Sequence, residues 1–125
     1  EKSITLDPFG AIAAVLKQTG LTIADIDVFE IHEAFAGQVL ANLNALKSAE
    51  WCKKQLGLDA PVGEIPKSKI NTWGGSLAIG HPFGATGGRL NTMAANSLQK
   101  EGGKYALLAA CAAGAHGHAM IIKKY

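Results

Sequence analysis

The feature that most constrains how this chain can fold is a glycine-rich stretch at residues 71–89, which reads NTWGGSLAIGHPFGATGGR. Glycine accepts positive φ angles and lets the backbone approach another surface closely. Pro82 has a fixed φ and disfavours a helical conformation for His81 before it. A loop of this kind, placed directly before a helical pattern, indicates that His81 is held in one position. His81 could act as a base or hydrogen-bond donor near neutral pH, although a lone histidine is usually structural.

Apolar periodicity on both sides of this stretch predicts helices that alternate with strands. A helix at residues 8–19 would begin with Asp7 as N-cap and Pro8 as its first residue, and would end at Gly20. A turn at residues 112–117 would join the last two strands and favours their antiparallel pairing. The other predicted elements are strands at 27–31, 104–111 and 119–122, and helices at 35–46, 51–56 and 90–101.

This order of elements predicts an α/β fold, with a mixed β-sheet covered by helices on both faces. No strand-plus-helix unit precedes Asp7, so the sheet is expected to lack its first strand and helix. We therefore expect residues 1–125 to form one domain of a larger unit, or one that a partner completes. Phe35 is predicted on the apolar face of the helix that Glu33 would cap. Residues 58–69 are predicted to form a surface loop.

The composition is that of a globular domain without a strongly charged partner. Of the 125 residues, 48% are hydrophobic and 18% are charged, which excludes a disordered chain. The net charge of +2 is too small to indicate nucleic acid or membrane binding, and no apolar run approaches the ~18 residues of a membrane span. Cys52 and Cys111 make a poor disulfide framework. We expect an intracellular location, either bacterial cytoplasm or a eukaryotic mitochondrion or peroxisome.

Two further residues could carry chemistry. Cys111 ends an apolar strand and is followed by Ala112, Ala113 and Gly114, whose small side chains would let a substrate reach the sulfur and the backbone N–H groups. The alternative is a buried cysteine that acts as a small hydrophobe. His32 follows a strand, where ligands often bind in α/β sheets, or it is a helix-entry residue with a local hydrogen bond. No second thiolate or carboxylate lies at ligand spacing from Cys111, so no metal is expected.

Three segments, taken in order, resemble the C-terminal half of a thiolase. They are His32-Glu-Ala-Phe-Ala, Gly80-His-Pro-Phe-Gly-Ala-Thr-Gly and Cys111-Ala-Ala-Gly. Their spacing and flanking residues are similar to the thiolase type that forms the β-subunit of trifunctional fatty-acid-oxidation complexes. The Gly-His-Pro motif is specific by itself, and three motifs in register make a chance match improbable.

The resemblance implies an acyltransferase that cleaves a 3-ketoacyl-CoA with a second CoA, or that runs the reverse Claisen condensation. His81 would activate the nucleophilic cysteine, and Cys111 would exchange a proton with the α-carbon of the substrate. His32 would help to place a water against the thioester oxygen, and the backbone N–H of Ala113 would be an oxyanion-hole donor. CoA and acyl-CoA would be substrates, with no cofactor and no metal. The substrate-binding loop residues would be Gly80, Phe83, Gly84 and Gly114.

In thiolases the acyl-accepting cysteine lies in the N-terminal half, and no residue of this chain matches it. We therefore predict that the chain has no thiolase activity by itself and that its first partner is an N-terminal thiolase half. Thiolases are generally dimers or tetramers, so a homo-oligomer is expected when the enzyme is complete. The hydratase/dehydrogenase α-subunit of a trifunctional complex is a further candidate partner.

Two other functions stay open at the level of sequence. The chain could be a non-catalytic module that keeps the thiolase fold to bind CoA esters or another protein. It could also belong to a different condensing enzyme, such as a ketoacyl synthase. The second alternative is disfavoured, because those enzymes typically have His or Asn where this chain has Cys111.

Overall fold

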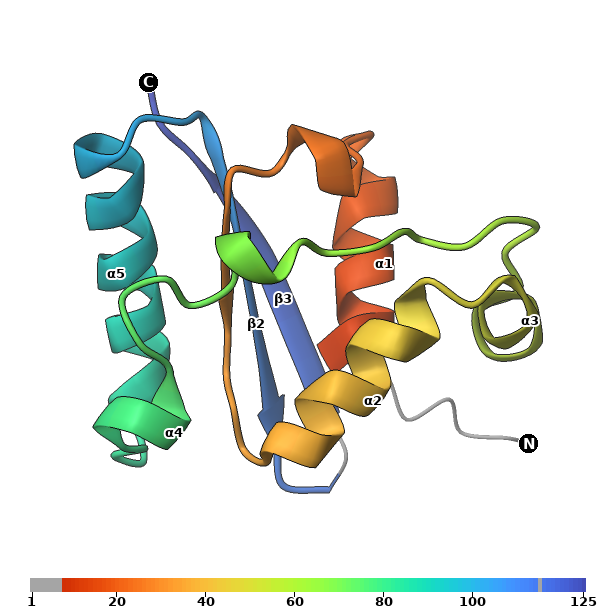
Figure 1. Cartoon of the computed structure of the whole chain (residues 1–125), viewed down its shortest axis with the longest axis horizontal. Coiled ribbons are helices and arrows are strands. Elements are labelled where there is room, and N and C mark those ends of the chain that lie inside the picture. Colours follow the sequence, from red (N-terminus) through yellow and green to blue (C-terminus); the bar gives the residue numbers. More distant parts are fainter. Residues whose placement is uncertain (1–7, 115) are drawn as a thin grey trace.

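The computed structural model describes residues 8–114 and 116–125, and it contains a three-stranded sheet flanked by helices (Figure 1). The strands are β1 (Val28–Ile31), β2 (Tyr105–Ala112) and β3 (His116–Lys123), in the order β1-β2-β3. β1 pairs with β2 in parallel, and β2 pairs with β3 in the antiparallel sense. The predicted α/β class and mixed sheet are therefore confirmed.

Two helices cover opposite faces of this sheet, as Figure 1 shows. Helix α1 (Pro8–Thr19) packs on β2 and β3, and helix α5 (Thr86–Lys100) packs on β1 and β2. Asp7, the predicted N-cap of α1, lies outside the described residues. The shorter elements are η1 (Ile23–Asp25), α2 (Ala36–Leu46), α3 (Ala49–Trp51), the π-helical turn η2 (Cys52–Leu56), η3 (Lys67–Lys69) and α4 (Ser76–Ile79).

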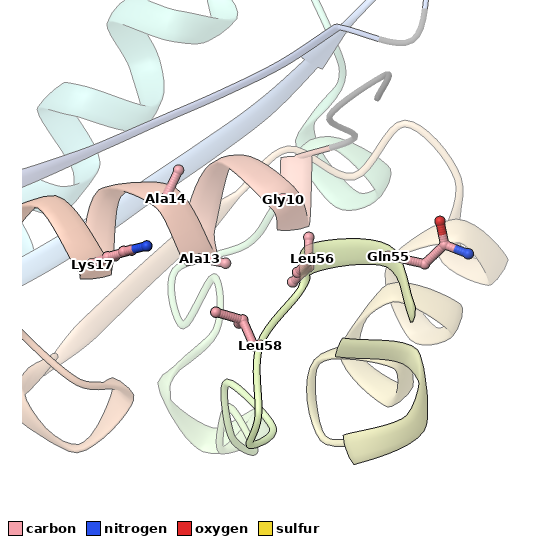
Figure 2. Close-up of a pocket in the computed structure, with 7 residues that line it drawn as sticks. All are labelled: Gly10, Ala13, Ala14, Lys17, Gln55, Leu56 and Leu58. Atoms are coloured by element: carbon pink, nitrogen blue, oxygen red, sulfur yellow. The ribbon is translucent and has the colours of Figure 1, made fainter. Parts of the chain in front are cut away.

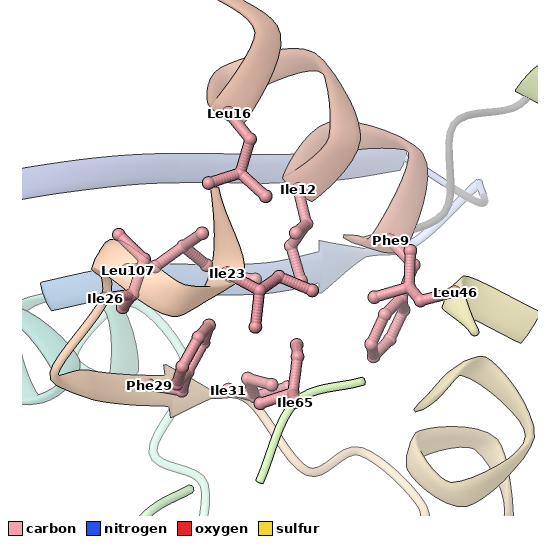
Figure 3. Close-up of a cluster of buried hydrophobic side chains, with 11 residues drawn as sticks. Phe9, Ile12, Leu16, Ile23, Ile26, Phe29, Ile31, Leu46, Ile65 and Leu107 are labelled. Atoms are coloured by element: carbon pink, nitrogen blue, oxygen red, sulfur yellow. The ribbon is translucent and has the colours of Figure 1, made fainter. Parts of the chain in front are cut away.

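The larger of two apolar cores lies between α1 and the sheet (Figure 3). Phe29 and Ile31 of β1 face this core, because alternate residues of a strand point to the same face. Ile65 also belongs to it, so the segment predicted as a surface loop supplies one core side chain. The buried members are Phe9, Ile12, Leu16, Ile23, Ile26, Phe29, Ile31, Leu46, Ile65, Leu107 and Ala109.

A second core lies between α5 and the other face of the sheet. Its buried members are Val28, Leu90, Ala94, Leu98, Ala106 and Leu108. Both faces of β1 are therefore covered, which explains why all four of its residues are buried rather than every second one. Glu30 lies on the same face as Val28 and is the one charged residue of this strand.

The helical region after His32 differs in detail from its prediction. Phe35 is not on the apolar face of α2: it is the extended N-cap residue (φ −147°, ψ 134°), and its side chain is 73% exposed. A residue with extended backbone lies outside the helical register, so the apolar spacing that includes it was misleading. The predicted interruption between the helices at 35–46 and 51–56 is confirmed: the Ser48 hydroxyl accepts a hydrogen bond from the Trp51 amide at 3.2 Å and starts a new helical turn.

The carboxyl ends of β1 and β2 lie at one edge of the sheet, because the two strands are parallel. The backbone N–H of His32 donates to the Ala109 carbonyl at 2.8 Å, which extends the ladder one residue beyond β1. Figure 1 shows that α4, the start of α2 and the turn between β2 and β3 gather at this end of the molecule. The fold therefore brings the three sequence segments singled out above to one end of the sheet.

Ser97 gives a test of this packing. Its side chain on α5 is 1% exposed, and its hydroxyl has no hydrogen-bond partner within the described part of the chain. A buried hydroxyl without a partner is destabilising, and alanine is the better helix former. We expect Ser97→Ala to raise the free energy of unfolding by about 1 kcal/mol in urea denaturation. A lower free energy of unfolding for the variant would mean that the hydroxyl has a partner in solution.

Candidate active site

The side chain of Asn71 joins the glycine-rich loop to the end of β1. Its Oδ1 accepts from the Ile31 amide at 2.8 Å, and its Nδ2 donates to the Ile31 carbonyl at 2.8 Å. Its own amide donates to the Phe29 carbonyl at 2.9 Å. Asn71 has a φ of 47°, a left-handed conformation that asparagine tolerates better than most residues. The loop is therefore paired to β1 much as another strand would be.

Glu33 caps a helix, but not the predicted one. Its Oε1 accepts from Asn71 Nδ2 at 2.7 Å, and its Oε2 accepts from the Leu77 amide at 3.0 Å. Leu77 is in the first turn of α4, so Glu33 caps α4 and not α2, which follows it in sequence. A carboxylate at a helix N-terminus satisfies free N–H groups. Gly75 makes this possible, because a Cβ at that position would collide with the Glu33 carboxylate.

The loop that Asn71 and Glu33 hold in place brings His81 onto His32. The two imidazole centroids are 4.1 Å apart, and the ring planes are tilted by 42°. His32 is 5% exposed, whereas His81 is exposed. Burial, with the nearby positive charges of His81 and Arg89, lowers the pKa of His32 below its ordinary value of 6.5, and Glu33 opposes this shift. His32 is therefore neutral at physiological pH, beside a more accessible imidazole.

Thr86, the first residue of α5, fixes the ring of His81. Its Oγ1 lies 2.7 Å from His81 Nδ1 and donates to the Pro82 carbonyl at 3.2 Å. A threonine hydroxyl that donates its single proton to Pro82 accepts from Nδ1–H of His81. The proton of neutral His81 is then on Nδ1, and its Nε2 carries a lone pair. This is the arrangement that a general base requires.

Three polar side chains, Arg89, Ser76 and Glu30, lie near the two histidines. Arg89 of α5 donates from Nη1 to the Gly80 carbonyl at 2.8 Å and from Nη2 to Ser76 Oγ at 2.8 Å. Ser76 Oγ also lies 2.8 Å from His32 Nδ1. Glu30 is 1% exposed, and burial, aided by Glu33 and opposed by Arg89, raises its pKa to about 7. Ser76, Arg89 and Glu30 had no predicted role.

Cys111 lies at the same end of the sheet but does not contact either imidazole by a hydrogen bond within the described chain. It is half-buried and its thiol is free. Its antiparallel neighbour is Gly117, so no side chain on β3 stands opposite the sulfur. Ala113 and Gly114 form the exposed turn after β2, and no described residue accepts a hydrogen bond from the Ala113 amide. The Cys111 thiol and the Ala113 N–H are thus two residues apart in sequence, at the end of β2.

The other predicted loop residues surround His81. The ring of Phe83 lies 4.8 Å from the His81 ring, centroid to centroid, and its side chain is 89% exposed. Gly80 and Gly84 have φ angles of 96° and 78°, values that a residue with a side chain rarely adopts. These residues give His81 an open, partly apolar border.

A separate groove lies between α1 and the end of η2, with Leu58 after it (Figure 2). It contains no histidine or cysteine and is lined by Gly10, Ala13, Ala14, Lys17, Gln55, Leu56 and Leu58. In residues 8–114 and 116–125, no group of three or more His, Cys, Asp and Glu side chains could hold a metal ion. Across the same residues, the helices are too short or too polar to span a bilayer. The histidine cluster is therefore the site with recognisable chemistry.

Comparison with known proteins identifies the family. The family profile described as thiolase, C-terminal domain, matches residues 1–124. This chain belongs to the thiolase family. A probable 3-ketoacyl-CoA thiolase of Caenorhabditis elegans is 57% identical over 122 residues, which cover 98% of this chain and 27% of the relative. The mitochondrial trifunctional enzyme subunit beta of Bos taurus is also 57% identical, with 98% and 26% covered.

Solved thiolase structures agree with this assignment. The crystal structure of human mitochondrial 3-ketoacyl-CoA thiolase matches with a TM-score of 0.75 and 36% identity, covering 98% of this chain and 27% of that one. The same enzyme in complex with CoA matches equally well. This thiolase segment thus has a partial thiolase fold and spans about a quarter of the length of the relatives it matches.

Gly75→Ala tests the contact between Glu33 and α4 in this thiolase segment. The backbone of Gly75 (φ −102°) suits alanine, so any cost comes from the collision with the Glu33 carboxylate. We expect the free energy of unfolding to fall by about 2–4 kcal/mol, because the carboxylate must leave Leu77 and Asn71. Gly87→Ala is the matched control, since no atom lies within 4 Å of its added Cβ, and it should stabilise α5 slightly. Equal effects of the two substitutions in thermal or urea unfolding would contradict the described contact.

Glu30→Gln tests the buried carboxyl. Its pKa is raised from 4.5 to about 7 on folding, so the folded state binds the proton more tightly than the unfolded state. Glu30 therefore destabilises the wild type progressively as the pH rises from about 4.5 to about 7. Relative to Glu30→Gln, the wild type should lose about 2–3 kcal/mol between the two ends of this window. Urea unfolding of both proteins measures the difference, and parallel pH profiles would contradict the raised pKa.

Proposed function

We propose that this chain is the C-terminal catalytic portion of a 3-ketoacyl-CoA thiolase, an acyltransferase of fatty-acid β-oxidation. The observation that carries the proposal is the contact between His32 and His81, whose rings lie 4.1 Å apart, at the end of the sheet where Cys111 is the second-last residue of β2. These are the three residues to which the thiolase resemblance assigns catalysis. The names of the relatives support the same activity and the same CoA-ester substrates.

In this proposal, His81 accepts the proton of a nucleophilic cysteine supplied by an N-terminal thiolase half. The lone pair on His81 Nε2, left by the contact of Nδ1 with Thr86, suits this task. Cys111 donates or accepts the proton at the α-carbon of the substrate. His32 holds a water against the thioester oxygen, and the Ala113 amide is a second oxyanion donor.

The substrate would enter along the exposed border formed by Gly80, Phe83, Gly84 and Gly114. The 89% exposed ring of Phe83 supplies an apolar surface for an acyl chain, and the glycines leave backbone accessible to polar parts of the ester. No cofactor is needed, because the nucleophilic cysteine carries the acyl group and His81 and Cys111 carry the proton transfers.

Two kinds of partner follow from this function. Residues 1–125 act as a partial thiolase C-terminal domain that depends on an N-terminal half for its nucleophile, and the complete enzyme forms a homo-oligomer. The relatives named as trifunctional enzyme subunit beta favour association with a hydratase/dehydrogenase α-subunit. Their mitochondrial location makes an intracellular site the expectation for this chain.

The test is thiolysis of 3-ketoacyl-CoA with free CoA, measured as loss of the enolate absorbance. We expect no turnover by the chain alone and turnover when it is combined with an N-terminal thiolase half. In the combined enzyme, Cys111→Ser should lower kcat by about 10²–10⁴-fold, the usual contribution of a general acid–base group. Cys52→Ser is the matched control: this buried thiol lies 3.4 Å from the Leu46 carbonyl, a contact that a serine hydroxyl can keep.

Two outcomes would contradict the proposal. Turnover by the chain alone, lost in Cys111→Ala, would make Cys111 the acyl carrier and remove the need for a second half. No turnover with the N-terminal half present, together with retained binding of a CoA ester, would favour the non-catalytic binding module instead.

A further inference from the structure

Each of the two adjacent imidazoles has a hydroxyl group close to its Nδ1. Ser76 Oγ lies 2.8 Å from His32 Nδ1, and Thr86 Oγ1 lies 2.7 Å from His81 Nδ1. A neutral imidazole has one N–H donor and one acceptor nitrogen, and the partner of either nitrogen decides which is which. The Thr86 hydroxyl donates to the Pro82 carbonyl, and in that arrangement it accepts a hydrogen bond from Nδ1–H of His81. The hydrogen bonds of Ser76 are different.

Ser76 Oγ receives a hydrogen bond from Arg89. A guanidinium has donors only, so the contact of Arg89 Nη2 with Ser76 Oγ at 2.8 Å uses the oxygen as acceptor. The proton of Ser76 has no other acceptor among the described residues, and His32 Nδ1 at 2.8 Å is within reach. Ser76 is buried, so donation to His32 avoids leaving this proton unpaired in the interior.

We propose that Ser76, polarised by Arg89, is a positioning residue that holds neutral His32 with its proton on Nε2, the opposite tautomer to His81. His32 Nδ1 then accepts from Ser76, and His32 Nε2–H is left as a donor. Because the hydroxyl prefers an unprotonated Nδ1, it also helps to keep the buried ring neutral. The two rings thus have different roles although they are the same residue type.

This inference rests on the proposed function for its consequence in catalysis. A donor at His32 Nε2 can hold the oxygen of a water or a thioester, and a lone pair at His81 Nε2 can take a proton. Arg89 contributes twice, because its Nη1 also holds the Gly80 carbonyl directly before His81. One guanidinium therefore connects the supports of both rings.

The experiment is a long-range proton–nitrogen correlation spectrum of the ¹⁵N-labelled chain, recorded at a pH of about 8, well above the ordinary histidine pKa. In such a spectrum a protonated ring nitrogen and one with a lone pair have clearly separated shifts. We expect His32 to show a lone pair at Nδ1 and a proton at Nε2, and His81 to show the reverse. A proton on His32 Nδ1 in the wild type overturns the proposal, and this measurement needs no substitution.

Ser76→Ala tests the assigned cause. Without the hydroxyl, the ratio of the Nε2–H to the Nδ1–H tautomer of His32 should fall about fivefold, as loss of one hydrogen bond predicts. The pKa of His32, followed in a pH titration of the same signals, should rise because a contact that favours the neutral ring is gone. Ser76→Thr keeps the hydroxyl and should restore both values.

Ser97→Ala is the matched control, a buried serine on α5 that contacts neither ring, and it should leave the His32 tautomer unchanged. An unchanged tautomer ratio in Ser76→Ala would overturn the role of Ser76. These spectra require neither the N-terminal half nor turnover. A failure of the thiolase proposal therefore leaves the tautomer result intact, and a failure here leaves the activity assay unaffected.

Discussion

The hydrogen bonds between the side-chain amide of Asn71 and the backbone of Ile31 are the interaction on which the rest of the site depends. A carboxamide presents an acceptor and a donor side by side, as a peptide group does, and Asn71 uses both on the backbone of Ile31. The same Nδ2 reaches Glu33, whose other oxygen caps α4. The end of β1, the glycine-rich loop and α4 are therefore one hydrogen-bonded unit. This unit and the contacts of Arg89 with Gly80 and Ser76 together hold His81 next to His32.

The charged side chains near the two imidazoles, Arg89 and Glu30, influence their chemistry. Like charges on two rings 4.1 Å apart repel each other, and Arg89 adds a third positive charge nearby. Burial, with this repulsion, lowers the pKa of His32 and favours its neutral form. Glu30 supplies a carboxyl on the same side of β1, and its raised pKa shows how costly a full negative charge would be there. The two histidines therefore belong to a cluster of interacting polar groups, which also includes Glu30 and Arg89.

Much of the fold could be predicted from sequence, because apolar spacing reports burial directly. The periodicity of α1 and α5, the apolar strand that ends in Cys111, and the strand before His32 all follow from it. Ile65 was missed because a single core residue in an irregular segment has no period. Phe35 was misplaced because the spacing rule cannot show where a helix begins.

The candidate site could be predicted only in part. His32 and His81 were found because one follows a strand and the other lies between glycine and proline. Their supports could not be found: Ser76, Thr86 and Arg89 resemble ordinary polar residues of a loop and a helix. The one usable signal was Glu30, a charged residue inside an apolar strand, which indicates a polar environment at that point of the sheet. Glu33 caps α4, which lies more than 40 residues further along the chain, whereas the local sequence predicted that it caps the helix directly after it.

Exposed apolar side chains around the histidines bear on how this segment works. Phe35, Leu77, Ile79 and Phe83 are each more than half exposed, and all four lie in the segments that hold His32 and His81. Such a group of apolar side chains is costly in water and usually marks a surface that binds something. An acyl chain along Phe83 and an N-terminal thiolase half over the remainder would cover it. In the proposed function, the active site would therefore form between two protein surfaces, and this chain would supply the surface that holds the proton-transfer groups. Burial of the apolar side chains would also lower the dielectric constant around those groups, which makes them more effective.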